Sequence, residues 1–414
     1  MHAVQQLMSA PWQQGLPWQL DARGELLLRG RPLSRVVAAV GGTPCYLYDR
    51  SRIEMRVAQL RALLPAELRL HYAVKCNPMP ALVGLLAGLS DGLDVASVGE
   101  LRVALDTGVS PQRISFAGPG KTDADLHQAQ AAGILVNVES ARELRALAEA
   151  SAASGEPARV AIRINPPFEL KASGMRMGGG PKQFGVDAEA VPALLDEIAR
   201  LGLAFEGFHL YAGSQNLKAA AIVEAQLRSY ELILGWAERL PAPLRSLNLG
   251  GGFGIPYTPS EAPLELAPIA DSLNALASRC RSDFPQAQLV LELGRYLVGE
   301  AGVYVTRVID RKRSRDHWFY VCDGGLHHHL AASGNFGQVL RRNYPLMVNA
   351  GGAQTEHASV VGPLCTPLDL LGDRVDLDAA AEGDLIVLFQ SGAYGKSASP
   401  REFLGHPEVR EALV

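Results

Sequence analysis

The chain has 414 residues, 48% hydrophobic and 20% charged, which is enough to form one large hydrophobic core and a smaller one. Its 39 basic and 43 acidic residues give a net charge of −4, which argues against a nucleic-acid-binding surface and a polybasic membrane patch. Five widely spaced cysteines without a CxxC motif, and an N-terminal segment unlike a signal peptide, predict a cytoplasmic protein that acts on a small molecule.

The N-terminal segment, residues 1–46, is predicted to form strands. ELLLRG (25–30) and PCYLYD (44–49) are short apolar runs of the kind that form strands. We expect these strands to join a β domain that the chain completes near its C-terminus.

A barrel is predicted for residues 47–300. Short runs rich in Val, Ile and Leu alternate there with longer helical stretches, which is the pattern of a parallel sheet. Eight strand–helix repeats are the number that closes a (β/α)8 TIM-type barrel. The eight runs lie at 68–75, 92–97, 114–118, 134–140, 159–165, 205–213, 246–252 and 289–295.

Polar residues and glycines gather at the carboxyl ends of these eight runs. A barrel of this type carries its chemistry on that face, so the pattern predicts a functional site there. The residues are Lys75, Asp94, Ser97, Gly118, Glu139, Arg163, Asn165, His209, Tyr211, Gly250, Gly251, Gly252, Glu292 and Arg295.

The pattern changes after Arg295. Strand-like runs at 303–309, 318–325, 358–364 and 384–392 follow one another without intervening helices. They predict a C-terminal β domain, a sandwich or barrel, over residues 301–414.

Lys75 is the first candidate for chemistry. It ends an apolar strand in HYAVKCNP, so its amine would project into the barrel mouth, where desolvation lowers a lysine pKa from about 10.4. Such an amine is a good nucleophile toward an aldehyde. The alternative interpretation is a surface lysine.

Two further features support a cofactor site. GGGFG (250–254) follows the seventh strand, where barrels often bind phosphate, although such a run can also be only a tight turn. Glu292 ends the eighth strand and could pair with a protonated pyridine nitrogen, and Arg295 could reach phosphate or a substrate carboxylate. The alternative for both is an ordinary ion pair at the barrel rim.

In family order, the motifs YAVKCNP, GLDVASVGEL, HLYAGSQ, GGGFG, ELGRYLV, GPLCTPLD and GAYGKSASP resemble those of the fold-type III pyridoxal-phosphate decarboxylases. This family includes diaminopimelate, ornithine and arginine decarboxylases. The resemblance implies that pyridoxal 5′-phosphate is the cofactor and that Lys75 binds it covalently. It places Glu292 at the pyridine nitrogen. It assigns the remaining cofactor contacts to Asp94, Arg163, Tyr211, Ser214, Gly250, Gly251, Gly252, Arg295 and Tyr394.

The resemblance also implies a homodimer with shared active sites. In this family the β domain of one subunit completes the barrel site of the other, so Cys365 would reach the partner's active site. A cysteine, with a reference pKa of about 8.5, can donate a proton to the product near neutral pH. An isolated cysteine in an apolar strand is otherwise more often a core residue.

Thr366 departs from the family pattern. Diaminopimelate and ornithine decarboxylases carry an acid directly after this cysteine, which recognises the distal amino group, whereas Asp369 could only partly substitute here. Tyr211 is a second departure, because it falls where those enzymes stack a histidine on the cofactor ring. Together with the segment at 323–345 and the ending FLGHP (403–407), these departures resemble a branch that acts on an amino acid tethered to an acyl carrier protein, such as the butirosin-type glutamyl decarboxylase and exosortase-associated relatives. Decarboxylation of free diaminopimelate or another diamino acid, a racemase, and a catalytically silent regulator are the alternatives.

The sequence leaves more than one role open for several further residues. Arg341, Arg342 and Tyr344 fall where family members bind the substrate carboxylate, but the spacing does not say which arginine does so; Arg295, Thr366 and Tyr394 are also expected at the substrate. His327 to His329, taken as a strand, cannot all reach one metal ion. The basic run RKRSR (311–315) is either a carrier-protein contact or a solvated hairpin turn, and GMRMGGGPKQFG (174–185) is either a lid or a passive loop.

Overall fold

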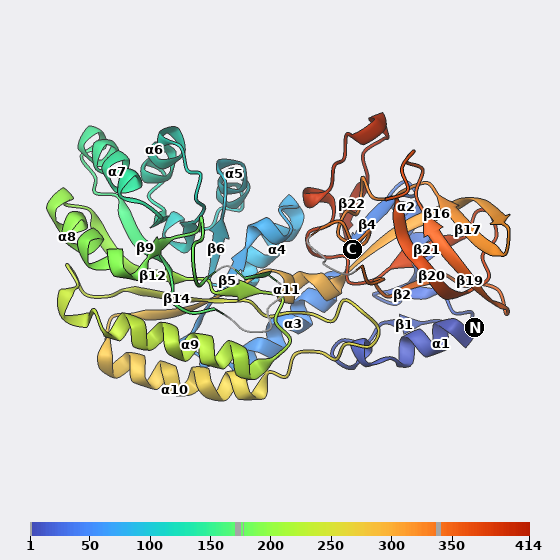
Figure 1. Ribbon diagram of the computed structural model, residues 1–414, viewed down its shortest axis with the longest axis horizontal. Coiled ribbons are helices and arrows are strands. Elements are labelled where there is room, and N and C mark those ends of the chain that lie inside the picture. Colours follow the sequence, from blue (N-terminus) through green and yellow to red (C-terminus); the bar gives the residue numbers. More distant parts are fainter. Residues whose placement is uncertain (1, 170–174, 177, 337–340) are drawn as a thin grey trace. The chain divides into compact units, whose positions relative to one another are not determined.

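The computed structural model describes residues 2–169, 175–176, 178–336 and 341–414, and the chain forms two compact units (Figure 1). The barrel unit comprises Val57–Gly254 and Leu264–Gly294. The β unit comprises Met1–Arg56, Ile255–Pro263 and Arg295–Val414. No helix in the described ranges is long and apolar enough to cross a membrane.

The eight predicted barrel strands form a closed ring of parallel strands. Each strand pairs with its neighbours in the order β5, β6, β7, β8, β9, β12, β14 and β15, and β15 pairs again with β5. The predicted TIM-type barrel is therefore confirmed. The strands are β5 (Arg69–Ala73), β6 (Gly92–Val95), β7 (Ile114–Phe116), β8 (Leu135–Val138), β9 (Arg159–Asn165), β12 (Ala204–Leu210), β14 (Ser246–Gly251) and β15 (Gln288–Leu293).

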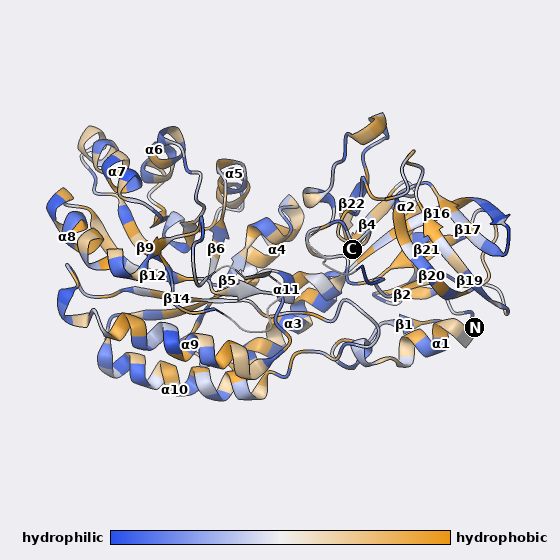
Figure 2. Ribbon diagram, in the orientation of Figure 1, coloured by the Kyte–Doolittle hydropathy of each residue, from blue (hydrophilic) through white to orange (hydrophobic). Residues whose placement is uncertain are grey.

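Helices follow the strands along the ring. Three of them begin just beyond a strand with a hydroxyl N-cap, because Ser97, Thr122 and Ser140 each accept a hydrogen bond from the backbone N–H three residues later. Figure 2 shows apolar and polar residues alternating on α9 and α10. The helices are α4 (Pro80–Leu89), α5 (Val98–Asp106), α6 (Asp123–Ala131), α7 (Ala141–Ser154), α8 (Val191–Leu201), α9 (Ala219–Leu234) and α10 (Ala267–Asp283), with α3 (Arg50–Leu63) before them.

The β unit is built on a mixed sheet, as predicted for the C-terminal part of the chain. Its strands run in the order β18, β21, β16, β17, β19 and β20, and β4 joins the edge of β16 and also pairs with β22. A separate three-stranded sheet consists of β1, β2 and β3. The bounds are β1 (Gln19–Leu20), β2 (Leu26–Leu28), β3 (Arg31–Pro32), β4 (Cys45–Tyr48), β16 (Gly302–Ser314), β17 (His317–Cys322), β18 (Leu346–Val348), β19 (Thr355–Val361), β20 (Leu370–Asp378), β21 (Leu385–Leu388) and β22 (Arg410–Leu413).

The N-terminal prediction was incomplete. β2 and β4 are the predicted strands, but the same segment also forms two helices, α1 (His2–Ser9) and α2 (Leu33–Ala39). Leu33, Val36 and Val37 are buried at a spacing of three and four residues, which is the spacing of one helix face. The run is too short for this period to be distinguished from a strand by sequence alone.

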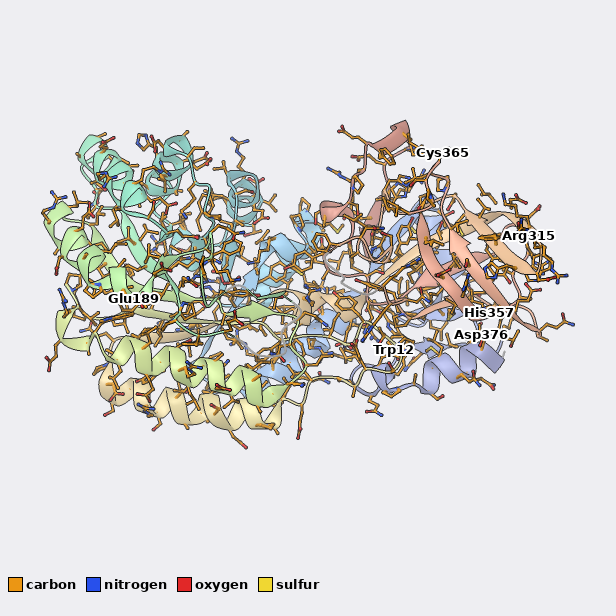
Figure 3. All side chains as sticks on the ribbon, in the orientation of Figure 1. Trp12, Glu189, Arg315, His357, Cys365 and Asp376 are labelled. Carbon is orange, nitrogen blue, oxygen red and sulfur yellow. The ribbon has the colours of Figure 1, made fainter. Side chains whose placement is uncertain are left out.

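An aromatic cluster forms part of the core of the β unit. The rings of Trp12 and Trp18 lie 5.1 Å and 5.6 Å from the ring of Phe389, and Trp12 is marked in Figure 3.

Residues 255–263 were expected within the barrel, but they belong to the β unit. There Gln390 donates a hydrogen bond to the carbonyl of Pro256 at 2.7 Å.

Candidate active site

Lys75, Glu292 and Tyr211 come together at the carboxyl ends of the barrel strands. Lys75 lies in a short 3-10 helix, η2 (Val74–Cys76), directly after β5. Its Nζ is 3.2 Å from Oε1 of Glu292 on the neighbouring β15, and 4.9 Å from the ring centroid of Tyr211. The Lys75 side chain is 36% exposed and that of Glu292 only 4%. A partly accessible amine therefore faces a buried carboxylate.

The Glu292 carboxylate is held from two sides. Its second oxygen, Oε2, lies 2.9 Å from Nε2 of His209 on β12. Burial by itself raises the pKa of Glu292, but the charge of Lys75 and the hydrogen bond with His209 outweigh it, with a further contribution from Arg163. The pKa of Glu292 is therefore well below its usual range, and the group is ionised at neutral pH.

A second buried charge network orients Arg163. This arginine, on β9, donates to Glu139 Oε1 at 2.9 Å. The same carboxylate accepts the backbone N–H of Gly118 at 2.6 Å and lies 3.7 Å from Nζ of Lys121. Lys121 was not predicted, because nothing in PGKTD distinguishes a lysine whose exposed fraction is 3% from one at the surface.

The glycine turn at the end of β14 leaves no room for side chains. Gly250 has a φ of +69°, and a Cβ there would lie 2.5 Å from the carbonyl oxygen of Leu210. A Cβ on Gly251 would collide with the carbonyl oxygen of Glu292. The backbone N–H of Asn216, just after Ser214, donates to Gly252 at 3.0 Å, so the two segments lie side by side.

Asp94 lies on β6, in register with Ala73 of β5. Its Oδ1 is 2.9 Å from Nδ1 of His71 and accepts the Ser115 hydroxyl at 2.5 Å. The sequence analysis did not single out His71, which sits in the middle of an ordinary strand pattern. The structure shows Asp94 in contact with these two side chains.

In the β unit, Arg295, Tyr344 and Tyr394 surround a residue that the sequence analysis missed, Tyr257. Arg295, at the start of α11 (Arg295–Val298), donates to the Tyr257 hydroxyl at 2.6 Å, and its guanidinium lies 4.7 Å from the ring centroid of Tyr394. The Tyr257 and Tyr344 rings are 4.8 Å apart. Burial holds the pKa of Tyr344 well above its usual value, so its hydroxyl stays neutral.

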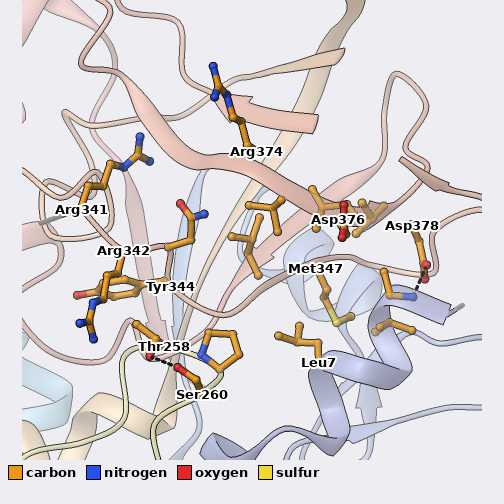
Figure 4. A pocket seen from close by; sticks show the side chains of 18 residues that line it. Leu7, Thr258, Ser260, Arg341, Arg342, Tyr344, Met347, Arg374, Asp376 and Asp378 are labelled. Atoms are coloured by element: carbon orange, nitrogen blue, oxygen red, sulfur yellow. Dashed lines mark hydrogen bonds between the residues drawn. The ribbon is translucent and has the colours of Figure 1, made fainter. Parts of the chain in front are cut away.

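Arg341 and Arg342 line a pocket of about 610 Å³ in the β unit, together with Tyr344. Figure 4 shows the two arginine side chains pointing in different directions. Arg341 donates to the carbonyl of Leu370 at 2.9 Å, whereas Arg342 lies 3.5 Å from Glu261.

Cys365 and Thr366 lie in the loop between β19 and β20. Cys365 is exposed (Figure 3). Asp369, the residue expected to substitute in part for a missing acid, is 2% exposed. Its two oxygens accept the backbone N–H groups of Leu326 and Leu364 at 2.5 Å and 2.7 Å. That expectation is corrected, because the carboxylate is buried and both its oxygens accept backbone N–H groups, one within the loop and one outside it.

Three other segments can now be placed. His327 to His329 were expected in a strand, but they lie in a turn. His328 forms a hydrogen bond with the carbonyl of Pro407, and His329 forms one with the hydroxyl of Ser391. The basic run ends β16 and enters a hairpin turn at Arg315. In the glycine-rich run, β10 (Met175–Arg176) pairs with β13 (Gly213–Ser214), while residues 174 and 177 lie outside the described residues.

Comparison with known proteins identifies the family. Residues 50–299 match the family model described as pyridoxal-dependent decarboxylase, pyridoxal binding domain. The chain is 39% identical to the L-glutamyl-[BtrI acyl-carrier protein] decarboxylase of Niallia circulans over 379 residues, covering 90% of this chain and 88% of the relative. The chain belongs to the pyridoxal-dependent decarboxylase family. It is a pyridoxal-phosphate-dependent amino-acid decarboxylase, as the sequence predicted.

Other members of the family are also similar. Diaminopimelate decarboxylase of Aquifex aeolicus is 32% identical over 398 residues, covering 94% of this chain and 91% of the relative. The structure of diaminopimelate decarboxylase from M. jannaschii in complex with L-lysine has a TM-score of 0.87 at 26% identity, covering 96% of this chain and 92% of that one.

The barrel unit of the decarboxylase fits the cofactor of the family. It offers an accessible amine, an ionised buried carboxylate beside that amine, and a glycine turn with no room for side chains. These are the features that an aldehyde, a pyridine nitrogen and a phosphate group require.

The pair of His71 and Asp94 predicts a pH-dependent contribution to stability. Burial lowers the pKa of His71, but the Asp94 carboxylate outweighs burial and leaves the pKa raised. The stabilisation is then fully present below the unfolded-state pKa of about 6.5 and is lost as pH rises through the folded-state pKa.

Urea unfolding across a pH series tests this. The difference in free energy of unfolding between the wild type and His71→Gln should be largest below about pH 6.5 and should shrink at higher pH. His127→Gln, at an exposed position on α6, is the matched control and should show no such trend. A difference that grows with pH would contradict the pairing.

Proposed function

We propose that this decarboxylase removes the α-carboxylate of an L-amino acyl group, such as glutamyl, that is tethered to an acyl carrier protein, and that it does so as a homodimer with shared active sites. The similarity to the glutamyl-carrier-protein decarboxylase supports the tethered substrate. A glutamyl group held through its side chain keeps a free α-amine and α-carboxylate but presents no distal ammonium.

The observation that carries this proposal is the absence of an available acid beside Cys365. Within residues 360–370, all of them described, Asp369 is the only acidic residue, and its oxygens accept backbone N–H groups. The side chain next to the cysteine is Thr366, whose hydroxyl accepts the backbone N–H of Leu368 at 3.3 Å. A neutral hydroxyl cannot form an ion pair with an ammonium group.

The residues of the barrel unit are assigned to the cofactor. Lys75 would bind it covalently through Nζ, and Tyr211 would stack on its ring. The backbone of Gly250 to Gly252, with Ser214, would hold the phosphate. When bound, pyridoxal phosphate would accept the electrons that are released when the bond between Cα and the carboxylate breaks.

Glu292 would keep a proton on the pyridine nitrogen. Because its pKa is low, Glu292 presents a full negative charge to that nitrogen and favours its protonated form. The hydrogen bond from His209 fixes the carboxylate in place. Arg163, held by Glu139, and Asp94 complete the assigned cofactor contacts.

The β unit would bind the amino acid and return a proton. Arg295, with Arg341 or Arg342 and with Tyr344 and Tyr394, would orient the substrate. Cys365 would protonate Cα in the active site of the other subunit.

Decarboxylation of a free diamino acid is the second candidate. The 32% identity to the diaminopimelate decarboxylase of Aquifex aeolicus favours it. The same assay that tests the tethered substrate decides between the two candidates.

A second prediction concerns the cofactor lysine. Lys75→Ala should lose the yellow absorbance of the cofactor-loaded protein, because no other amine is assigned to the covalent bond. Lys218→Ala, at an exposed position before α9, is the control and should keep the absorbance. Absorbance retained in Lys75→Ala would mean that another residue binds the cofactor.

A third prediction concerns the substrate. Carbon dioxide release should be observed from a glutamyl thioester on a carrier protein and not from free glutamate, diaminopimelate, lysine, ornithine or arginine. Thr366→Glu should lower kcat/KM for the tethered substrate by about tenfold or more, because it places an unpaired carboxylate beside the reacting group. Thr366→Ser is the matched control. Release from a free diamino acid by the wild type would overturn the tethered-substrate proposal.

A further inference from the structure

An open groove crosses one face of the β-unit sheet. It has a volume of about 570 Å³ and lies over β16, β17, β19 and the loop that carries Thr366. His317, Phe319 and Val321 point into it from alternate positions of β17. At about 3.3 Å per residue these three positions span about 13 Å along the strand, toward the Thr366 loop. The groove is therefore elongated and ends at that loop.

Two cations line this groove, Lys312 and Arg374. Both are exposed, and neither side chain has an ion-pair or hydrogen-bond partner among the described residues. The two arginines that flank Lys312 in the chain do have ion-pair partners. On the other face of the hairpin, Arg311 pairs with Glu356 and Arg313 pairs with Asp316. The basic run is thus divided between the two faces of the hairpin, and Lys312 lies on the groove face without an ion-pair partner among the described residues. Two carboxylates, Asp373 and the buried Asp369, also line the groove.

The rest of the groove is mostly apolar with a few polar groups. Phe319 and Val361 lie on its floor, and the Ser359 hydroxyl bridges Nε2 of His317 and the carboxylate of Asp373. Asp373 is thereby engaged within the wall. An occupant would meet cations in the middle of the groove and apolar surface toward Thr366.

We propose that this groove binds the phosphopantetheine arm of the carrier protein, with Lys312 and Arg374 on its phosphate and the thiol end directed to Thr366. The inference rests on the proposed function, because it needs a tethered substrate. A carrier protein holds its acyl group on the thiol of such an arm, which joins one phosphodiester to a chain of methyl and methylene groups with one hydroxyl and two amides. The phosphate matches the two cations of the groove, and the mixed chain matches a lining that offers apolar side chains such as Phe319 and Val361 beside the polar groups of Ser359 and His317.

The test uses two small thioesters in place of the carrier protein. γ-Glutamyl phosphopantetheine and γ-glutamyl pantetheine differ only in the phosphate, and carbon dioxide release gives kcat/KM for each. The cofactor-loaded wild type should prefer the phosphorylated thioester by about tenfold or more, since each charge-assisted contact contributes about one order of magnitude.

In the double variant Lys312→Ala, Arg374→Ala this preference should disappear, so that kcat/KM is about the same for the two thioesters. Arg35→Ala, which removes another exposed arginine of the same unit, should keep the wild-type preference. A preference of about onefold in the wild type, or one that survives in the double variant, would overturn the groove assignment while leaving the tethered substrate intact.

Two further outcomes are distinguishable. If neither thioester is decarboxylated while a free diamino acid is, the proposed function fails and the groove assignment fails with it. If the double variant changes the sedimentation of the protein from dimer to monomer and keeps the thioester preference, the groove is an interface between two copies of this chain.

Discussion

The ion pair between the buried carboxylate of Glu292 and Lys75, completed by the hydrogen bond with His209, determines what this site can do. A carboxylate 4% exposed is costly to bury unless its charge is compensated, and here one oxygen faces each partner. The barrel makes this possible, because β15 and β5 are neighbours in the closed ring. Breaking the ring would separate the three groups.

The same constraint explains why the site is built from strand ends. Each charged group stands where a strand ends, so its backbone is fixed by the ladder while its side chain faces the rim. Arg163 acts on Glu292 through its charge from β9, and its own orientation depends on Glu139 and the buried Lys121. The electrostatics of one carboxylate thus depend on groups that come from much of the barrel.

Much of this was predictable from sequence, for a physical reason. Parallel strands buried on both faces appear as apolar runs, and all eight were found within a few residues of their observed bounds. Side chains that end a strand, such as Lys75 and Glu292, were found by the same pattern. Lys121 and Tyr257 were missed, because burial and long-range contact leave no local signal.

The β unit was predicted less completely. Helix α2 was taken as strand because seven residues are too few to show a period, and His327 to His329 were taken as strand where the chain makes a turn. The contacts of Asp369 could not be anticipated either, since they join backbone groups 43 and 5 residues away along the chain.

Protonation of the cofactor's pyridine nitrogen is expected to depend on the charge of Glu292. The most direct measurement is the ¹⁵N NMR shift of the pyridine nitrogen in the enzyme loaded with labelled cofactor, compared with Glu292→Gln. We expect a protonated nitrogen in the wild type and an unprotonated one in the variant. A nitrogen protonated in both proteins, or in neither, would contradict the role given to Glu292.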